Sequence, residues 1–124
     1  MNWEQALQQI KSTVMLNVRL DKNSKFRIVT EAPPEFLCSR YNFKGLPGYK
    51  VQVGETDFVD VPFRMLEQIF DASMKNGGIY NRSVFKSLYP TQLNGKGCYV
   101  HVIGKIFTKA KVAVQVDSRQ YELV

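Results

Sequence analysis

The sequence predicts an α+β fold, in which amphipathic helices and short antiparallel strands follow one another along a single chain. Three observations lead to this prediction. In some segments apolar residues recur every three to four positions, as on the buried side of a helix. In others apolar and polar residues alternate, which is typical of half-buried strands. Clusters of glycine, proline and asparagine separate these segments and mark the turns between them.

The composition is that of a globular protein. Of the 124 residues, 44% are hydrophobic and 23% are charged, values that argue against a disordered or fibrous chain. No apolar run approaches the roughly 18 residues that a membrane span needs. The first residues also lack the basic and apolar pattern of a secretory signal. We therefore expect a cytoplasmic protein without a membrane partner.

A helix and a small antiparallel β-hairpin are expected in residues 1–57. Apolar side chains recur with helical spacing from Trp3 to Val14 and predict a helix from about Asn2 to about Leu16, for which Asn2 is a suitable cap. This part of the chain is nearly neutral and rich in apolar residues. It therefore suits packing on the rest of the chain, on a partner protein or on a second copy in a homodimer.

Four segments of the first half have the composition of strands. Three of them, Phe26–Thr30, Phe36–Phe43 and Tyr49–Val53, are followed by a brief fourth at Phe58–Val61. The Gly45–Gly48 cluster is a strong turn signal, so we expect the second and third segments to form a hairpin.

Aromatic and basic residues alternate within this expected hairpin. Tyr41 and Phe43 lie next to Arg40 and Lys44, a pattern that can stack single-stranded bases. The alternative is that these aromatic side chains belong to the core of the hairpin.

Three helices are expected in residues 58–124. The first spans Phe63–Lys75, where apolar positions have a clear helical period, and it ends at the Asn76–Gly78 cluster. A second, shorter helix is capped by Asn81 and ends before Pro90.

A loop is expected from Tyr89 to Gly97, and the segment after it is assigned to a third helix. Its composition is strand-like, but on a helical wheel the apolar side chains from Tyr99 to Ala110 occupy one continuous arc and the polar ones the opposite arc. A strand would instead place Gly104 on the same side as the buried valines, so the periodicity favours the helix.

A terminal β-hairpin is predicted from two alternating segments, Val112–Val116 and Tyr121–Val124, which flank the polar turn Asp117–Gln120. The order of elements from residue 58 resembles that of winged helix-turn-helix DNA-binding domains: a short strand, three helices and a hairpin. This resemblance of topology and pattern covers about the last 65 residues. It implies that the third helix enters the major groove of DNA and that the hairpin is the wing.

The resemblance implies that the chain has two parts, an N-terminal extension of residues 1–57 and a winged-helix-like domain of residues 58–124. We expect the two parts to pack together as one unit. Positive charge is concentrated in the second part. The net charge of +6 divides into +1 up to Pro62 and +5 after it, and between Asp71 and Asp117 there are seven lysines and arginines and no acidic residue. Such a stretch sets up a field suited to a polyanion, although a chance run in a basic protein is the alternative.

The resemblance also implies a set of DNA contacts. The third helix would present His101, Lys105, Thr108 and Lys109 outward, and Gly104 among them would let a base or backbone approach closely. Contacts to phosphate would come from the second helix, the ends of the third helix and the tip of the wing. The expected nucleic-acid-binding residues are Arg82, Lys86, Lys96, His101, Lys105, Thr108, Lys109, Lys111 and Arg119. A solvated helix surface is the alternative for the third helix.

Metal and catalytic sites are not expected. Cys98 and His101 supply only two of the four ligands of a structural zinc site, and Cys38 has no partner at zinc spacing. An enzyme would have to use His101 or the carboxylates of Glu55–Asp60. We therefore expect a DNA-binding protein without a cofactor, acting as a regulator or accessory factor in transcription, replication, recombination or restriction. The alternative is an interaction module whose basic surface docks an acidic protein.

Overall fold

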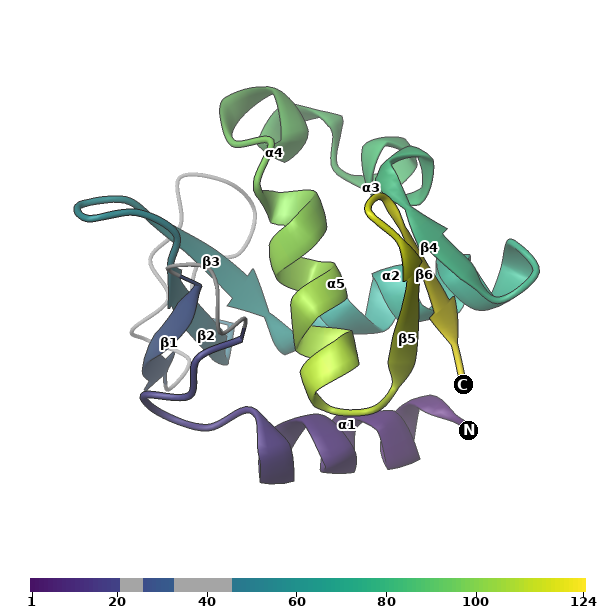
Figure 1. Cartoon of the computed structure of the whole chain (residues 1–124), viewed down its shortest axis with the longest axis horizontal. Helices are drawn as coiled ribbons and strands as arrows, with labels where there is room; N and C mark the ends of the chain where they lie inside the picture. Colours follow the sequence, from purple (N-terminus) through teal and green to yellow (C-terminus); the bar gives the residue numbers. More distant parts are fainter. Residues whose placement is uncertain (21–25, 33–45) are drawn as a thin grey trace.

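The computed structural model describes residues 1–20, 26–32 and 46–124. Within them, two antiparallel three-stranded sheets lie on opposite sides of a central helix (Figure 1). The expected α+β class is confirmed, with a helix near the N-terminus and a β-hairpin at the C-terminus. The expected strand Phe36–Phe43 and the Arg40–Lys44 pattern lie outside the described residues. No helix in the described part is long and apolar enough to cross a membrane.

The N-terminal helix α1 (Trp3–Thr13) begins where it was expected. The side chain of Asn2 accepts a hydrogen bond from the N–H of Gln5 (2.9 Å), and the Asn2 N–H donates to the Gln5 side chain (3.0 Å). This reciprocal pair satisfies two N–H groups that the first turn leaves without helical partners.

The end of α1 comes earlier than the expected position near Leu16. Val14 is already extended, and Asn17 has a left-handed backbone with φ of 66°. The N–H of Asn17 donates to the carbonyl of Ile28 (2.8 Å). Hydrogen bonds to the first sheet therefore replace the last turn that the apolar pattern predicted.

The first sheet has the strand order β1-β2-β3, formed by β1 (Arg27–Ala32), β2 (Gly48–Gln52) and β3 (Phe58–Pro62). Gly48 faces the backbone of Pro62 so closely that an added Cβ would overlap it. The brief strand expected near Phe58 is therefore the third strand of this sheet. The first sheet therefore crosses the boundary expected after residue 57, because β1 and β2 lie before it and β3 lies after it.

The helix α2 (Phe63–Lys75) follows β3 directly and has the predicted bounds. Gly77 and Gly78 end it in left-handed conformations that glycine adopts at little cost. The helix α3 (Arg82–Leu88) is capped by Asn81, whose side chain accepts a hydrogen bond from the N–H of Val84 (3.2 Å), as predicted.

Two elements were not predicted. The strand β4 (Ile79–Asn81) has three residues, too few to show alternation, and it exists because it pairs with β6 (Gln120–Leu123). The helix α4 (Pro90–Gly95) occupies most of the expected loop from Tyr89 to Gly97. Pro90 begins this helix, where its missing N–H costs nothing, and does not merely follow the end of α3. The C-terminal part thus has four helices and not three.

The central helix α5 (Tyr99–Lys109) confirms the helical interpretation of this segment. It stands between the two sheets in Figure 1 and is bound to both. The Tyr99 hydroxyl donates to the carbonyl of Asp60 in β3, and the Tyr80 hydroxyl of β4 donates to the carbonyl of Val100, each at 2.8 Å.

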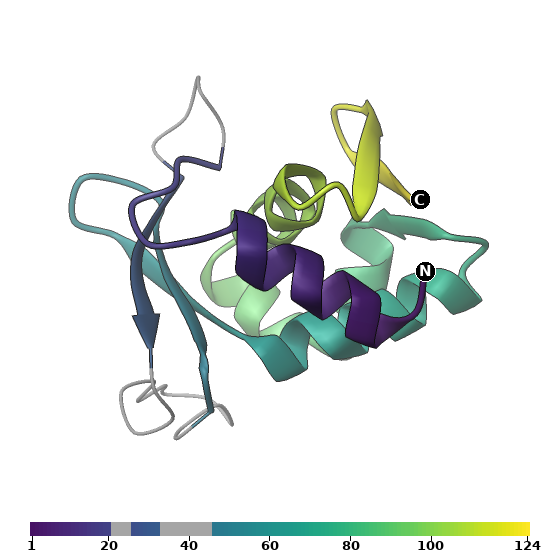
Figure 2. The ribbon, with the colours of Figure 1, turned by 90° about the horizontal axis from the view of Figure 1, so that it is seen from below.

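The N-terminal helix joins the two parts of the chain. Figure 2 shows α1 beside α2 and below the end of α5. The rings of Trp3 and Phe70 lie 5.6 Å apart, and the side-chain amide of Gln9 donates to the carbonyl of Ala110 (2.9 Å) just after α5. Residues near the N-terminus therefore support the helix to which the resemblance gives the DNA-binding role.

The second sheet has the order β4-β6-β5, and its β5 (Ala113–Asp117) forms the predicted terminal hairpin with β6. This hairpin runs beside α5 in Figure 1. Gly104 is buried, and a Cβ at this position would overlap the ring of Tyr121. The expectation that Gly104 leaves room for a base is therefore wrong, because the Tyr121 ring occupies that space.

Replacing Gly104 with alanine tests this packing. Forcing a methyl group against a buried ring costs roughly 1–3 kcal/mol, and the better helix propensity of alanine returns about 1 kcal/mol. We expect Gly104→Ala to lower the free energy of unfolding by up to about 2 kcal/mol in urea denaturation. Gly97→Ala is the control, since its Cβ meets no atom within 4 Å. A Gly104→Ala protein more stable than the wild type would contradict the packing.

Candidate nucleic-acid interface

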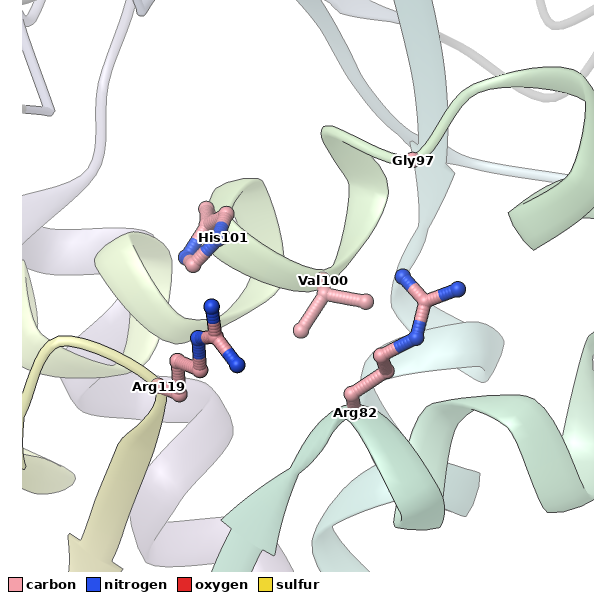
Figure 3. A pocket seen from close by; sticks show the side chains of 5 residues that line it. All are labelled: Arg82, Gly97, Val100, His101 and Arg119. Carbon is pink, nitrogen blue, oxygen red and sulfur yellow. The ribbon is translucent and has the colours of Figure 1, made fainter.

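Three basic side chains from three elements line one pocket of about 360 Å³. Arg82 is the first residue of α3, His101 lies in the first turn of α5, and Arg119 lies in the turn between β5 and β6. Gly97 and Val100 complete the lining (Figure 3). The two guanidinium groups lie on either side of Val100 in this view, and the imidazole of His101 lies above the guanidinium group of Arg119.

The register of the second sheet brings the two arginines together. Asn81, the last residue of β4, pairs with Gln120, the first residue of β6. Arg82 follows Asn81 and Arg119 precedes Gln120, so the two arginines flank a single pair of strand residues. The fixed pairing of the strands therefore determines how they face the pocket.

The turn that contains Arg119 is stabilised by a hydrogen bond within the turn and by a contact between β6 and α5. The N–H of Arg119 donates to the carboxylate of Asp117 (2.8 Å). The hydroxyl of Tyr121 lies 3.5 Å from Nδ1 of His101. These contacts place the hairpin tip beside the first turn of α5.

The hairpin also covers part of the α5 surface that was expected to face DNA. The ammonium group of Lys105 donates to the side-chain oxygen of Gln115 in β5 (2.7 Å), and the hydroxyl of Thr108 donates to the carbonyl of Gly104 (2.8 Å). His101, Lys105 and Thr108 are partly buried, whereas Lys109 is exposed. Much of the polar arc of α5 thus makes contacts within the protein.

The other expected residues lie outside the pocket. Lys86 is exposed on α3, one turn after Arg82. Lys111 is exposed beyond the other end of α5, in a left-handed conformation with φ of 61°. Lys96 forms an ion pair with Asp57 and donates to the carbonyl of Phe58 (3.2 Å). The charge of Lys96 is therefore largely compensated by the turn between β2 and β3.

Two groups that could support catalysis, the Cys98 thiol and the Asp60 carboxylate, are poorly activated or already paired. Burial raises the pKa of the Cys98 thiol, and the Asp57 carboxylate raises it further, while Lys96 acts in the opposite direction. Reactive cysteines instead have a lowered pKa. The Asp60 carboxylate lies 3.7 Å from the ammonium group of Lys50. In the described residues no group of three or more histidine, cysteine, aspartate or glutamate side chains could hold a metal ion.

Sequence reasoning identified Arg82, His101 and Arg119 one by one but not the pocket that they share. It also missed Gln115 and Tyr121, which hold the hairpin against α5. No short-range pattern marks these contacts, because they join residues 10 and 20 positions apart in the chain. The pocket also depends on the pairing of β4 with β6, which are about 40 residues apart.

No protein-family model, curated protein or solved structure matches this chain. Its function is therefore inferred from the residues and their arrangement.

The environment of Cys98 predicts slow reaction with alkylating reagents. Since the raised pKa leaves less thiolate at mildly alkaline pH, iodoacetamide should modify Cys98 more slowly than a cysteine in an unstructured peptide. The measurement uses a Cys38→Ser background, so that one thiol reacts. Lys96→Met should shift the pH profile further upward, because Lys96 lowers this pKa. A rate above that of the peptide would show an activated thiol and would contradict the raised pKa of Cys98.

Proposed function

We propose that this chain binds nucleic acid, with duplex DNA as the favoured ligand, through the basic surface of α3, α5 and the β5–β6 hairpin. The observation that carries the proposal is the convergence of Arg82, His101 and Arg119 on one pocket. Phosphate groups are bound by such clusters of guanidinium and imidazole donors. A role as a regulator or accessory factor in DNA transactions would follow from this binding.

The distribution of charge supports the same surface. Between Asp71 and Asp117 the chain has seven lysines and arginines and no acidic residue. Six of them lie on α3, on α5 or next to the ends of α5, and Lys75 lies apart from them at the end of α2. Five basic side chains of the proposed surface are exposed to solvent. They are Arg82, Lys86, Lys109, Lys111 and Arg119. Neutralising phosphates with such side chains releases condensed cations from DNA, so the affinity should depend steeply on salt.

The resemblance to winged helix-turn-helix domains supports an orientation in which α5 faces a groove and the hairpin lies beside it. His101 and Lys109 are eight residues apart, or about 12 Å along the helix axis. Between them, Lys105 and Thr108 already have partners within the protein. Few side chains remain for reading base edges, so we propose that phosphate contacts dominate and that sequence selectivity is low.

A salt titration with charge-removing variants tests this proposal. If the five exposed basic residues each neutralise one phosphate, a plot of the logarithm of the affinity for a short duplex against the logarithm of the salt concentration should have a slope of about −4.5. Lys109→Gln/Lys111→Gln should weaken binding and reduce the size of this slope by about 2. Fluorescence anisotropy at about 50 to 200 mM salt measures both.

The matched control is Arg19→Gln/Lys75→Gln, which removes two exposed positive charges outside the proposed surface. It should retain most of the affinity, since only the long-range field changes. Equal losses in the two double variants would show binding through net charge alone and contradict the assigned surface. Absence of binding to duplex DNA, single-stranded DNA and RNA at low salt would overturn the proposal and favour an acidic protein partner.

A further inference from the structure

We infer that the pocket between Arg82, His101 and Arg119 binds a single phosphate group and prefers a terminal phosphomonoester to an internal phosphodiester. In the setting of the proposed function, on which this identification rests, the ligand is the phosphate at the end of a nucleic-acid strand. Binding of a free phosphate ion by the same pocket does not depend on the proposed function.

The lining supplies donors from several directions. Each guanidinium group presents a planar fork of N–H donors, and the imidazole adds a ring nitrogen. Because Arg82, His101 and Arg119 come from three different elements, they surround the space and do not form a single row (Figure 3). A tetrahedral anion accepts hydrogen bonds in several directions, which fits a lining of this kind.

The start of α5 strengthens the positive field in the pocket. Its first turn has no acidic side chain, and the side chain of Cys98, at the cap position, makes no capping hydrogen bond. The positive end of the dipole of this 11-residue helix therefore adds to the two guanidinium charges. Gly97 at the pocket wall has no side chain that would obstruct an incoming ligand.

The two arginines are not neutralised within the described part of the chain. None of the residues that line the pocket is acidic, and neither guanidinium group forms an ion pair with a described carboxylate. The nearest acidic residue in sequence, Asp117, accepts the backbone N–H of Arg119 and offsets part of the charge. Two neighbouring positive charges repel each other, and a bound anion would remove this repulsion.

Charge and oxygen count favour a monoester. A phosphomonoester has a charge of about −1.5 to −2 at neutral pH, close to the opposite of two guanidinium groups, whereas a diester has a single negative charge. The monoester also has three terminal oxygens that accept hydrogen bonds, which matches three basic side chains, while a diester has two. A strand end can enter the pocket without the chain having to continue on the other side.

The test compares one duplex sequence with either phosphate or hydroxyl groups at its strand ends. At moderate salt the phosphorylated duplex should bind about tenfold more tightly in fluorescence anisotropy, the gain from one additional set of charge-assisted hydrogen bonds. The comparison is made separately for the 5′ and 3′ ends. Arg82→Gln/Arg119→Gln should abolish the preference. Lys109→Gln, at the far end of α5, should weaken both duplexes and leave their ratio unchanged.

A second measurement uses the wild-type protein, so its result does not depend on whether a variant folds. Phenylglyoxal modifies accessible arginines, and mass spectrometry reports each site. Sodium phosphate should slow the modification of Arg82 and Arg119 but not of exposed Arg19, relative to sodium chloride at equal ionic strength.

The outcomes separate this inference from the proposed function. Protection by phosphate with equal affinity for both duplexes would overturn the terminal preference and assign the pocket to an internal phosphate. Duplex binding without protection or preference would overturn the pocket as a phosphate site while the proposed function stands. Protection without binding of any nucleic acid would overturn the proposed function and the strand end as ligand, but would support the phosphate site.

Discussion

The close packing of the Tyr121 ring on Gly104 is the contact on which the C-terminal half of this molecule depends. Because position 104 has no Cβ, the terminal hairpin can lie directly against α5. This places the Tyr121 hydroxyl near His101 and the hairpin turn beside the first turn of the helix. The same strand β6 pairs with β4, which leads into α3. The contact between α5 and the hairpin, together with the pairing of β4 with β6, thus brings the three basic residues to one pocket.

The sequence predicted the elements whose signals are local. The helical period and the caps Asn2 and Asn81 located α1, α2 and α3, and the segregation of apolar residues distinguished α5 from a strand. The strand β4 and the helix α4 were missed for different reasons. The strand exists only through its partner, and Pro90 was interpreted as following a helix end although it begins a helix.

The candidate site was predicted only as separate residues. Positive charge and the resemblance to winged helix-turn-helix domains singled out Arg82 and Arg119 before their positions in space were known. Their convergence could not be predicted, since it depends on the register that pairs Asn81 with Gln120. Lys96 was included among the expected DNA contacts because of its positive charge. In the structure Asp57, which lies 39 residues earlier in the chain, compensates that charge. The helical wheel correctly separated the two sides of α5 but could not show that a hairpin covers part of the polar side.

The most direct test of the proposed surface maps DNA onto the folded protein by NMR, with ¹⁵N-labelled chain titrated with an unlabelled duplex. We expect the largest amide shifts at residues 82–86, 97–101, 109–111 and 117–120, with the strands of the first sheet nearly unchanged. Shifts concentrated on β1, β2 and β3 would contradict the assigned surface, and the absence of shifts at low salt would contradict nucleic-acid binding itself.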